Sequence, residues 1–462
     1  MPPQLAFIIH PKCFGPTPAL KQGTTRVAAG ACERIGQPAS LPPRPLSPQL
    51  TVTNSRREAP GLELQYTLMS ASAASRPSAR RGACALVAIL SALLVFGWTA
   101  ARIHYAFGGN WTAAFFTGTT FRVPPDLNAG TYRFEGNGYD GQFYRYLAHD
   151  PFLLRGYSRY MDAPQLRSRR LLVPLAAWLF GFGQRRWIDG AYIAVEMLFL
   201  ALGAYWCARL LARRDRSPLW GLLFVVVPAT MASFDRMLVD GPLTALFAGF
   251  LLYCEEERWT RVWVMAMLAD LTRETGLLLS AALVTDRLWH RDWRRAAWFA
   301  SSGVPAAAWY GYLATRQAHD APVSLLAVPA GGLVRRLLWF RTVPDPDPRV
   351  QLLLRVTDVL AVLGLAISII LAVRWLLQRR SGPASLCVGF FTALALVLGA
   401  PGHMLDAFGF ARPVSPLLLW VTIEAVSRKQ WSAIVPPLLV SIGVGVVFIR
   451  PFLAVMKGLL GR

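Results

Sequence analysis

The chain has 462 residues, of which 54% are hydrophobic and only 16% carry a charge. Soluble domains average about 25% charged residues, so this composition excludes an ordinary soluble protein and predicts a polytopic membrane protein. The formal net charge is +22. We interpret that excess as cationic loops that orient membrane helices rather than as a surface for nucleic acid, and we expect no nucleic-acid partner. Long apolar runs recur, whereas the short alternating segments of a transmembrane barrel do not.

Residues 1–68 differ from the rest of the chain because they are rich in Pro, Gly, Ser and Thr and lack a long apolar run. Met69 begins a stretch of Ser, Ala and Arg that leads into the first apolar helix, which is typical of a natural start. We therefore predict that residues 1–68 are a disordered extension or a mis-called start. Residues 69–455 would form the membrane domain, and residues 456–462 a short tail.

From Arg80 onward, the apolar stretches predict an all-α polytopic membrane protein with about 11 transmembrane helices. Several are shorter than the ~20 residues that an untilted span needs, so we expect some half-helices or broken pairs. The predicted helices cover residues 82–101, 189–212, 218–234, 239–254, 260–272, 275–287, 295–314, 352–377, 384–400, 411–426 and 432–450.

Arginine is concentrated in the short loops on one side of this arrangement. By the positive-inside rule that side is cytoplasmic, which places the N-terminus inside the cell and the C-terminus outside. The cationic loops are those at residues 76–81, 209–216, 287–295, 379–380 and 428–429.

Two long segments, 102–188 and 315–351, then fall on the outer side. The first carries Trp111 and several Tyr residues among Gly, Asp and Arg. A loop of this length is usually functional rather than a connector. Near its end, Leu171 to Phe182 form an apolar stretch that is bracketed by arginines and too short to span a bilayer. We predict that this stretch is a helix lying in the membrane interface.

The densest polar cluster lies in the first of these loops, at residues 135–151. Gly136, Gly138 and Gly141 permit a tight turn around Asp140. The residues after this turn have helical spacing, so Asp140 is predicted at a helix N-terminus. Two interpretations stay open: Asp140 is a helix cap, or its carboxylate faces the bilayer surface and takes a proton from a hydroxyl.

Two further clusters lie at helix junctions. Charged residues flanked by apolar helix, as at Arg273 and Glu274, are costly in a membrane and usually face an interior cavity. The alternative is that Arg273 and Glu274 neutralise each other. In the cluster 403–413, Arg412 just inside a helix start is suited to bind a phosphate, or equally to anchor the helix at the lipid headgroups.

A fourth cluster joins Phe234, Asp235 and Arg236 with Asp240. In the eleven-span arrangement all four clusters open to the outer side, beside the long first loop. One outer cavity that contains a candidate base, arginines and aromatic walls fits an anionic lipid with a polar head.

The same residues carry a resemblance to a known family. The segment 138–144 (Gly-Tyr-Asp-Gly-Gln-Phe-Tyr), followed by Ala-His-Asp-Pro at 148–151, resembles the first-loop motif of bacterial membrane proteins related to the GT-C glycosyltransferases. The likeness extends over roughly residues 82–455. Shorter segments that also fit lie at residues 169–175, 271–276 and 410–413.

The resemblance implies an inverting glycosyltransferase of the bacterial inner membrane. Such an enzyme moves a hexose from a polyprenyl-phosphate carrier to a lipid or glycan acceptor at the extracytoplasmic face, in cell-surface glycan or glycolipid formation. By the resemblance, Asp140 would be the general base that activates the acceptor hydroxyl. The predicted substrate-binding residues are Arg273 and Arg412 for the carrier phosphate, Tyr139, Gln142 and His403 for the sugar or acceptor, and Glu274.

One departure concerns metal binding. Many relatives carry two adjacent acidic residues in this loop, whereas Asp140 stands between Tyr139 and Gly141. We therefore predict no metal and no cofactor. Two alternatives to an enzyme remain: a lipid or glycan transporter or flippase, which broken helices and buried charges would suit, and a non-catalytic assembly factor with a GT-C-like fold.

Overall fold

A computed structural model describes residues 62–317, 328–338, 347–379, 381–399, 404 and 406–460. The chain forms two compact units. Of the unit His10–Arg76, the structure describes only residues 62–76, which are helical. The prediction for residues 1–68 therefore falls largely outside the described residues. From Pro77 onward the chain belongs to the other unit, which contains the membrane helices.

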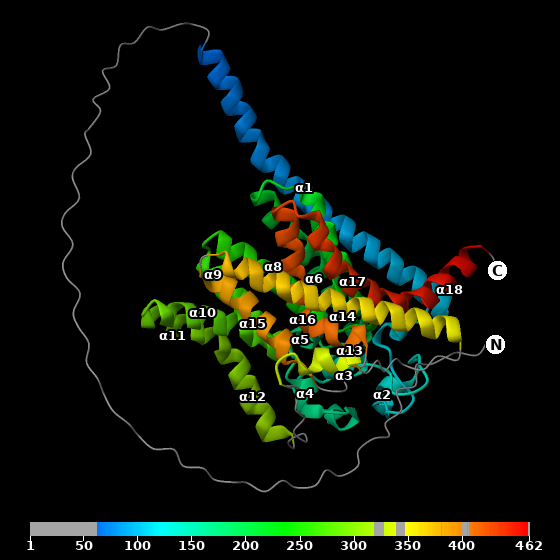
Figure 1. Cartoon of the computed structure of the whole chain (residues 1–462). Coiled ribbons are helices and arrows are strands. Elements are labelled where there is room, and N and C mark those ends of the chain that lie inside the picture. The colour runs from blue at the N-terminus through cyan, green and yellow to red at the C-terminus, as the bar shows by residue number, and fades with distance from the viewer. Residues whose placement is uncertain are drawn as a thin grey trace. The chain divides into compact units, whose positions relative to one another are not determined.

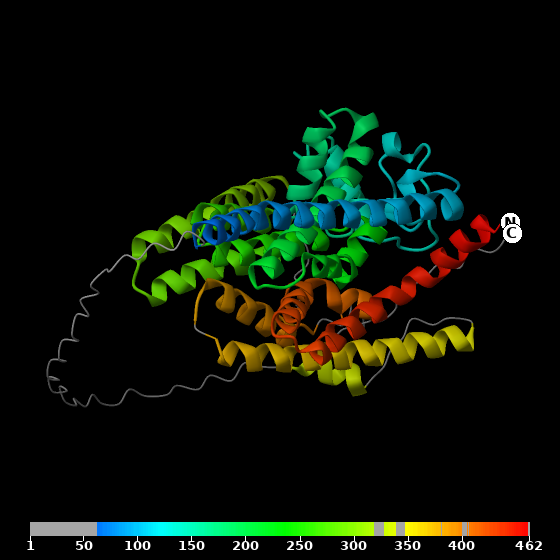
Figure 2. The same ribbon diagram turned by 90° about the horizontal axis from the view of Figure 1, so that it is seen from above.

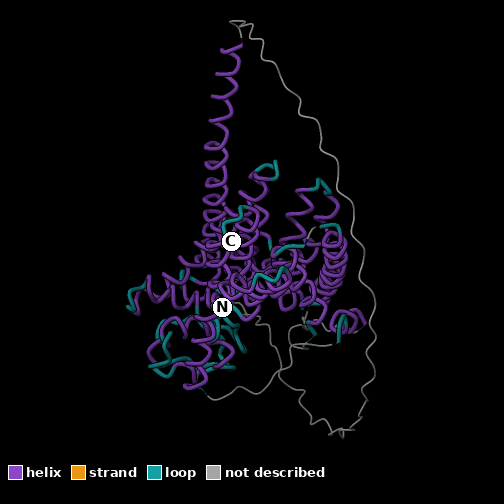
Figure 3. Tube along the Cα trace, turned by 90° about the vertical axis from the view of Figure 1, so that its left-hand side faces the viewer, coloured by secondary structure: helices purple, strands orange, loops and turns teal. Residues whose placement is uncertain are grey.

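The described chain consists of helices and loops without a strand, so the all-α prediction is confirmed for these residues (Figures 1 and 3). The α-helices are α1 (Leu62–Phe107), α2 (Pro125–Asn128), α3 (Gly141–His149), α4 (Pro164–Ser168), α5 (Leu172–Phe180), α6 (Arg185–Arg213), α7 (Pro228–Arg236), α8 (Asp240–Glu255), α9 (Trp259–Thr272), α10 (Leu277–Trp289), α11 (Trp293–Ala300), α12 (Val304–Arg316), α13 (Gly331–Leu338), α14 (Pro348–Leu377), α15 (Pro383–Val397), α16 (Ala407–Ser427), α17 (Val435–Gly445) and α18 (Ile449–Leu459).

Short 3-10 helices interrupt or connect these elements. They are η1 (Trp111–Phe115), η2 (Tyr157–Tyr160), η3 (Pro218–Val226), η4 (Glu274–Gly276), η5 (Ser301–Gly303), η6 (Trp431–Ile434) and η7 (Val446–Phe448).

Every predicted apolar stretch coincides with a helical region, but some stretches are broken. The predicted helix 218–234 is two elements, η3 and α7, bent by 57°. Pro228 begins α7 and lacks the N–H that would continue the preceding helix. The predicted helix 295–314 is likewise interrupted by η5 between α11 and α12.

Length and composition qualify a smaller number of helices as membrane spans. Within the described residues, four helices are long and apolar enough to cross a bilayer, or five if the bent pair η3–α7 counts as one span. The four are Arg80–Phe107, Arg185–Arg213, Pro348–Leu377 and Trp431–Leu459. The protein therefore has the helices of a multi-pass membrane protein.

Helix α16 lies at the centre of the packing. Its residues from Ala407 to Val426 are all buried, and it contacts α6, α7 and α8 on one side and α14, α15 and α17 on the other. Figure 2 shows the carboxyl-terminal helices, yellow to red, gathered on one side of the green and cyan helices. Polar side chains on α16 are consequently surrounded by helices from both halves of this unit.

The predicted outer loop 102–188 contains the short helices η1 to α5, of which α3 and α5 pack on α6 and on each other. Its predicted helix at Leu171 to Phe182 is α5. In the second predicted loop, 315–351, the structure describes α13, which packs on α14 and α15. Much of the remainder of that loop lies outside the described residues.

Candidate functional site

Two glycines position the turn around Asp140, one against the first loop itself and one against the end of α7. Gly138 has a φ of +66°, and a Cβ atom there would lie 2.2 Å from the Gly118 nitrogen. A Cβ atom on Gly141 would lie 2.0 Å from the backbone oxygen of Arg236. Only glycine permits both approaches, so this local sequence sets where α3 begins.

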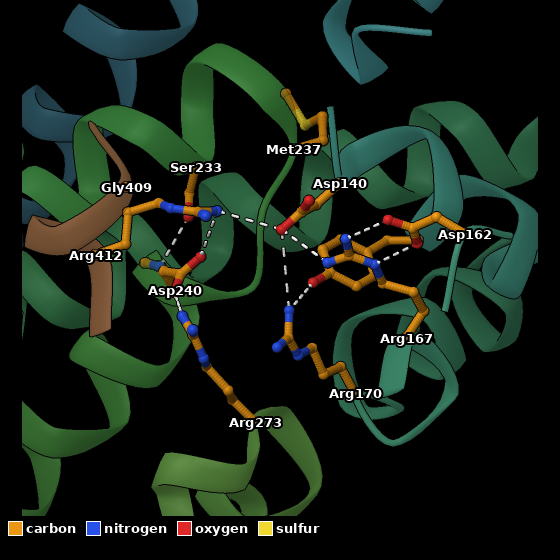
Figure 4. Close-up of polar contacts among 12 residues, drawn as sticks. Asp140, Asp162, Arg167, Arg170, Ser233, Met237, Asp240, Arg273, Gly409 and Arg412 are labelled. Carbon is orange, nitrogen blue, oxygen red and sulfur yellow. Dashed lines mark hydrogen bonds and ion pairs between the residues drawn. The ribbon is translucent and has the colours of Figure 1, made fainter. Parts of the chain in front are cut away.

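Asp140 occupies the N-cap position of α3, as predicted, but its side chain makes no capping hydrogen bond. Instead its Oδ2 atom lies 2.9 Å from Nη1 of Arg167, 3.4 Å from Nη1 of Arg412 and 4.0 Å from Nη1 of Arg170 (Figure 4). The interpretation of Asp140 as a helix cap is therefore not supported, because the carboxylate is turned toward arginines.

Three arginines control the protonation of this carboxylate. Burial alone would raise the pKa of Asp140, but the charges of Arg167, Arg412 and Arg170 outweigh burial and hold its pKa well below the ordinary value. Arg167 responds in the opposite sense: burial opposes its charge, yet Asp140 and Asp162 raise its pKa well above the usual value. Asp140 is thus an ionised carboxylate at neutral pH.

Arg412 connects Asp140 to a second carboxylate, that of Asp240 at the start of α8. Its Nη1 atom lies 3.5 Å from Oδ2 of Asp240, and Arg273 forms an ion pair with the other oxygen of Asp240. In Figure 4, Arg412 and Arg273 approach Asp240 from different sides. We call Asp140, Arg167, Arg170, Asp240, Arg273 and Arg412 the Asp140 cluster.

The predicted residue Glu274 pairs with the first loop rather than with its neighbour Arg273. Its Oε2 atom lies 3.3 Å from Nε of Arg170, and Arg170 also donates a hydrogen bond to the hydroxyl of Tyr144. Arg273 turns instead to Asp240. The alternative in which Arg273 and Glu274 neutralise each other is therefore not what the structure contains, because each has a partner from another segment.

Aromatic side chains form one wall of the cluster. The guanidinium of Arg412 lies 5.0 Å from the ring centre of Tyr139, and that of Arg236 lies 4.3 Å from the same ring and 4.2 Å from that of Phe408. Cations are attracted to aromatic faces at such distances. Burial raises the pKa of Tyr139 to about 12, so its hydroxyl stays protonated. The structure thus brings the predicted residue Tyr139 into the site.

Of the two other residues predicted to contact the sugar or the acceptor, the structure describes Gln142 but not His403. Gln142 is buried and braces the loop: its Oε1 accepts a hydrogen bond from the Gly118 N–H (3.2 Å), and its Nε2 donates one to the backbone oxygen of Asn137 (2.8 Å). Both ends of its side chain are therefore engaged with backbone. His403 lies outside the described residues.

Three members of the cluster were not assigned to the site from the sequence. In the sequence, Arg167 is only a charge before an apolar stretch, Arg170 belongs to a short segment of the family resemblance without an assigned role, and Asp240 is part of a polar group at a helix end. Arg170 and Glu274 are 104 residues apart, and no local pattern predicts that they pair.

An apolar groove of about 400 Å³ reaches α7 at Phe234. Its other lining residues include Val95, Trp98, Met231, Phe448 and Phe452.

Among the described side chains, no three His, Cys, Asp or Glu residues are grouped so that they could hold a metal ion.

No protein-family model, curated protein or solved structure matches this chain. The functional conclusion therefore depends on the chemistry of the Asp140 cluster. An ionised carboxylate can accept a proton from a hydroxyl, and several arginines can neutralise a phosphate. These two capacities lie within one group of contacts, beside aromatic rings.

Proposed function

We propose that the protein is a GT-C-type membrane glycosyltransferase that transfers a hexose, with inversion, from a polyprenyl-phosphate carrier to a lipid or glycan acceptor. The reaction would take place at the extracytoplasmic face of the bacterial inner membrane. The observation that carries this proposal is the convergence of two carboxylates, Asp140 and Asp240, with arginines from the first loop, from the α9–η4 junction and from α16.

The charge distribution along α8 supports the proposed sidedness, in which the Asp140 cluster lies on the outer side. Asp240 begins α8 and Glu255 ends it, which places the two residues roughly 22 Å apart along the helix axis. Glu255 pairs with Arg214, which belongs to an arginine-rich loop. The Asp140 cluster and the arginine-rich end are thus at opposite ends of α8, as expected if one end faces the cytoplasm and the other the outer surface.

In the proposed reaction, the acceptor hydroxyl gives its proton to the carboxylate of Asp140. The oxygen of the acceptor hydroxyl attacks the anomeric carbon from the face opposite to the phosphate, and the bond between that carbon and the phosphate oxygen breaks. The electron pair of this bond leaves with the polyprenyl phosphate. Arg412 and Arg170 would neutralise the negative charge on the departing phosphate.

Two features of the helices favour the alternative of a lipid or glycan transporter. The pair η3–α7 is bent by 57°, and α16 contains Pro413 and Pro416 within its length. Discontinuous helices with charges at the break are typical of transporters. A non-catalytic assembly factor would keep the same helices and would not need the carboxylate.

The surface-glycan profile of cells that lack the gene tests the proposal. Wild type, Asp140→Asn and Asp215→Asn would be expressed at matched membrane abundance, since Asp215 is exposed and lies on the arginine-rich loop. We expect wild type and Asp215→Asn to restore the profile and Asp140→Asn to lower the product by about 100-fold or more. Restoration by Asp140→Asn would favour a transporter or an assembly factor instead.

A further inference from the structure

The arginines around Asp140 have the arrangement of an anion receptor. Three guanidinium groups, from α4, from the segment before α5 and from α16, converge on the single atom Oδ2 of Asp140. One carboxylate oxygen needs fewer cations than this, whereas a phosphate group offers several charged oxygens to the same donors.

Hydrogen-bonding capacity also remains unused in the cluster. Arg273 and Arg412 are only 5% and 7% exposed, yet the Nε–H of each has no acceptor in the part of the chain that the structure describes. Buried guanidinium groups normally satisfy such donors, because each unpaired one is costly. An anion with more oxygens than a carboxylate could reach donors that Asp140 leaves unpaired.

We propose that the Asp140 carboxylate, in the ligand-free protein, holds the position that the phosphate of a lipid-phosphate ligand takes, so that the two anions compete for Arg167, Arg170 and Arg412. The naming of the ligand as a lipid phosphate rests on the proposed function. The competition itself rests on the ion pairs of Asp140 with these three arginines.

This competition determines the order of events at the site. A carboxylate surrounded by three arginines is a weak proton acceptor. When a phosphate takes over these arginines, Asp140 is released and becomes a stronger base. The acceptor hydroxyl would therefore be activated only after the lipid phosphate has bound. This coupling is reciprocal: the factor by which bound phosphate weakens the ion pairs of Asp140 equals the factor by which those ion pairs weaken phosphate binding.

Binding of farnesyl phosphate to the purified full chain in detergent tests the competition. We expect Asp140→Asn to bind farnesyl phosphate about tenfold more tightly than wild type, because no carboxylate has to be displaced. Arg412→Gln should bind it about tenfold more weakly than wild type. Inorganic phosphate and farnesol, used alone, separate the contribution of the headgroup from that of the apolar tail.

Asp162→Asn is the matched control, because Asp162 contacts Arg167 without occupying the position of Asp140. We expect this variant to change the affinity by less than about threefold. If Asp162→Asn and Asp140→Asn bound farnesyl phosphate with an equal gain in affinity, the gain would come from the loss of a negative charge in general, and the proposal would be overturned. Unchanged or weaker binding by Asp140→Asn would also overturn it.

A measurement on the wild-type protein covers the case in which Asp140→Asn fails to fold. Carbodiimide labels carboxyl groups that can be protonated, so release of Asp140 should increase its labelling when farnesyl phosphate is added. Unchanged labelling at saturating ligand would contradict the proposal. Neither measurement depends on glycosyl transfer, so competition can be confirmed or overturned whatever the surface-glycan profile shows.

Discussion

Two clusters of charge lie near opposite ends of α16, and they use their ion pairs differently. Near the carboxyl end, Glu424 is 2% exposed. Its Oε1 atom accepts hydrogen bonds from Arg214 (2.5 Å) and Arg379 (2.8 Å), and its Oε2 atom accepts one from Arg428 (3.3 Å). Both oxygens are therefore satisfied. We call Glu424 and these three arginines the Glu424 cluster.

The Asp140 cluster, near the amino end of α16, is incompletely satisfied. Three of its four arginines converge on one oxygen of the Asp140 carboxylate, which is 17% exposed, and two buried Nε–H groups lack acceptors within the described residues. From this comparison we infer that a saturated cluster fixes helices together, whereas an unsaturated one can exchange its anion. Substitution of Glu424 should therefore change mainly the stability of the protein, whereas substitution of Asp140 should change mainly the binding of the ligand.

Loss of the anion in the Glu424 cluster should give the largest effect on stability. Glu424→Gln leaves three arginines, which follow the carboxyl ends of α6, α14 and α16, without their shared carboxylate. Breaking a buried ion pair in this way typically costs about 3 kcal/mol of unfolding free energy. Thermal melting in detergent measures the change, with Glu257→Gln on an exposed residue as the control. Equal melting temperatures would show that the cluster does not fix the helices.

Displacement of Asp140 by overpacking should have a somewhat smaller effect on stability and a clear effect on transfer. Gly141→Ala places a Cβ atom against the backbone oxygen of Arg236, so α3 must shift, at a cost of about 2 kcal/mol. Both melting temperature and product should fall. Gly311→Ala, where a Cβ atom meets nothing within 4 Å, lies inside α12 and should lower neither, because alanine is favoured over glycine in a helix. A fully active Gly141→Ala would contradict the positioning of Asp140 by this glycine.

Loss of the two hydrogen bonds of Gln142 should lower the stability less than Glu424→Gln or Gly141→Ala does. Gln142→Ala removes two hydrogen bonds to backbone, which should lower the unfolding free energy by about 1 to 2 kcal/mol. Because no member of the Asp140 cluster is removed, we expect farnesyl phosphate affinity to change by less than about threefold. A much larger loss of affinity with little loss of stability would restore Gln142 as a ligand contact.

The smallest expected effect is a dependence of the unfolding free energy on pH in the acidic range. Because the pKa of Asp140 is lowered in the folded protein, its ion pairs stabilise the fold above the unfolded pKa of about 4. That contribution is lost as the pH falls from there through the folded pKa. The difference in unfolding free energy between wild type and Asp140→Asn should thus be constant from neutral pH to about pH 4 and narrow below it. A difference that widens on acidification would contradict the assignment.

The sequence predicts the helices well because long apolar runs are local signals, but it places their ends less well. Helix α16 is predicted from residue 411, whereas it begins at Ala407, because Asp406 caps it by accepting a hydrogen bond from the Gly409 N–H (2.7 Å). Arg412 consequently lies more than one turn inside the helix. A cap in a polar stretch is a weak signal beside an apolar run.

The site is predictable only in part for a related reason. Asp140, Tyr139 and Arg412 stand out because polar residues are rare in this chain and glycines frame the turn. The partners Arg167, Arg170 and Asp240 depend on which helices pack together, which is a property of the tertiary structure. Gln142 belongs to the same local motif as Asp140, yet its side chain turns to the backbone of the loop.

The central claim, that one anion is exchangeable and the other is not, is tested most directly by ligand rescue of stability. The melting temperatures of wild type, Asp140→Asn and Glu424→Gln would be measured with and without farnesyl phosphate. We predict that the ligand stabilises Asp140→Asn by about 1.4 kcal/mol more than wild type, the equivalent of tenfold tighter binding, and stabilises Glu424→Gln no more than wild type. Equal gains in the two variants, or no extra gain in Asp140→Asn, would contradict the claim.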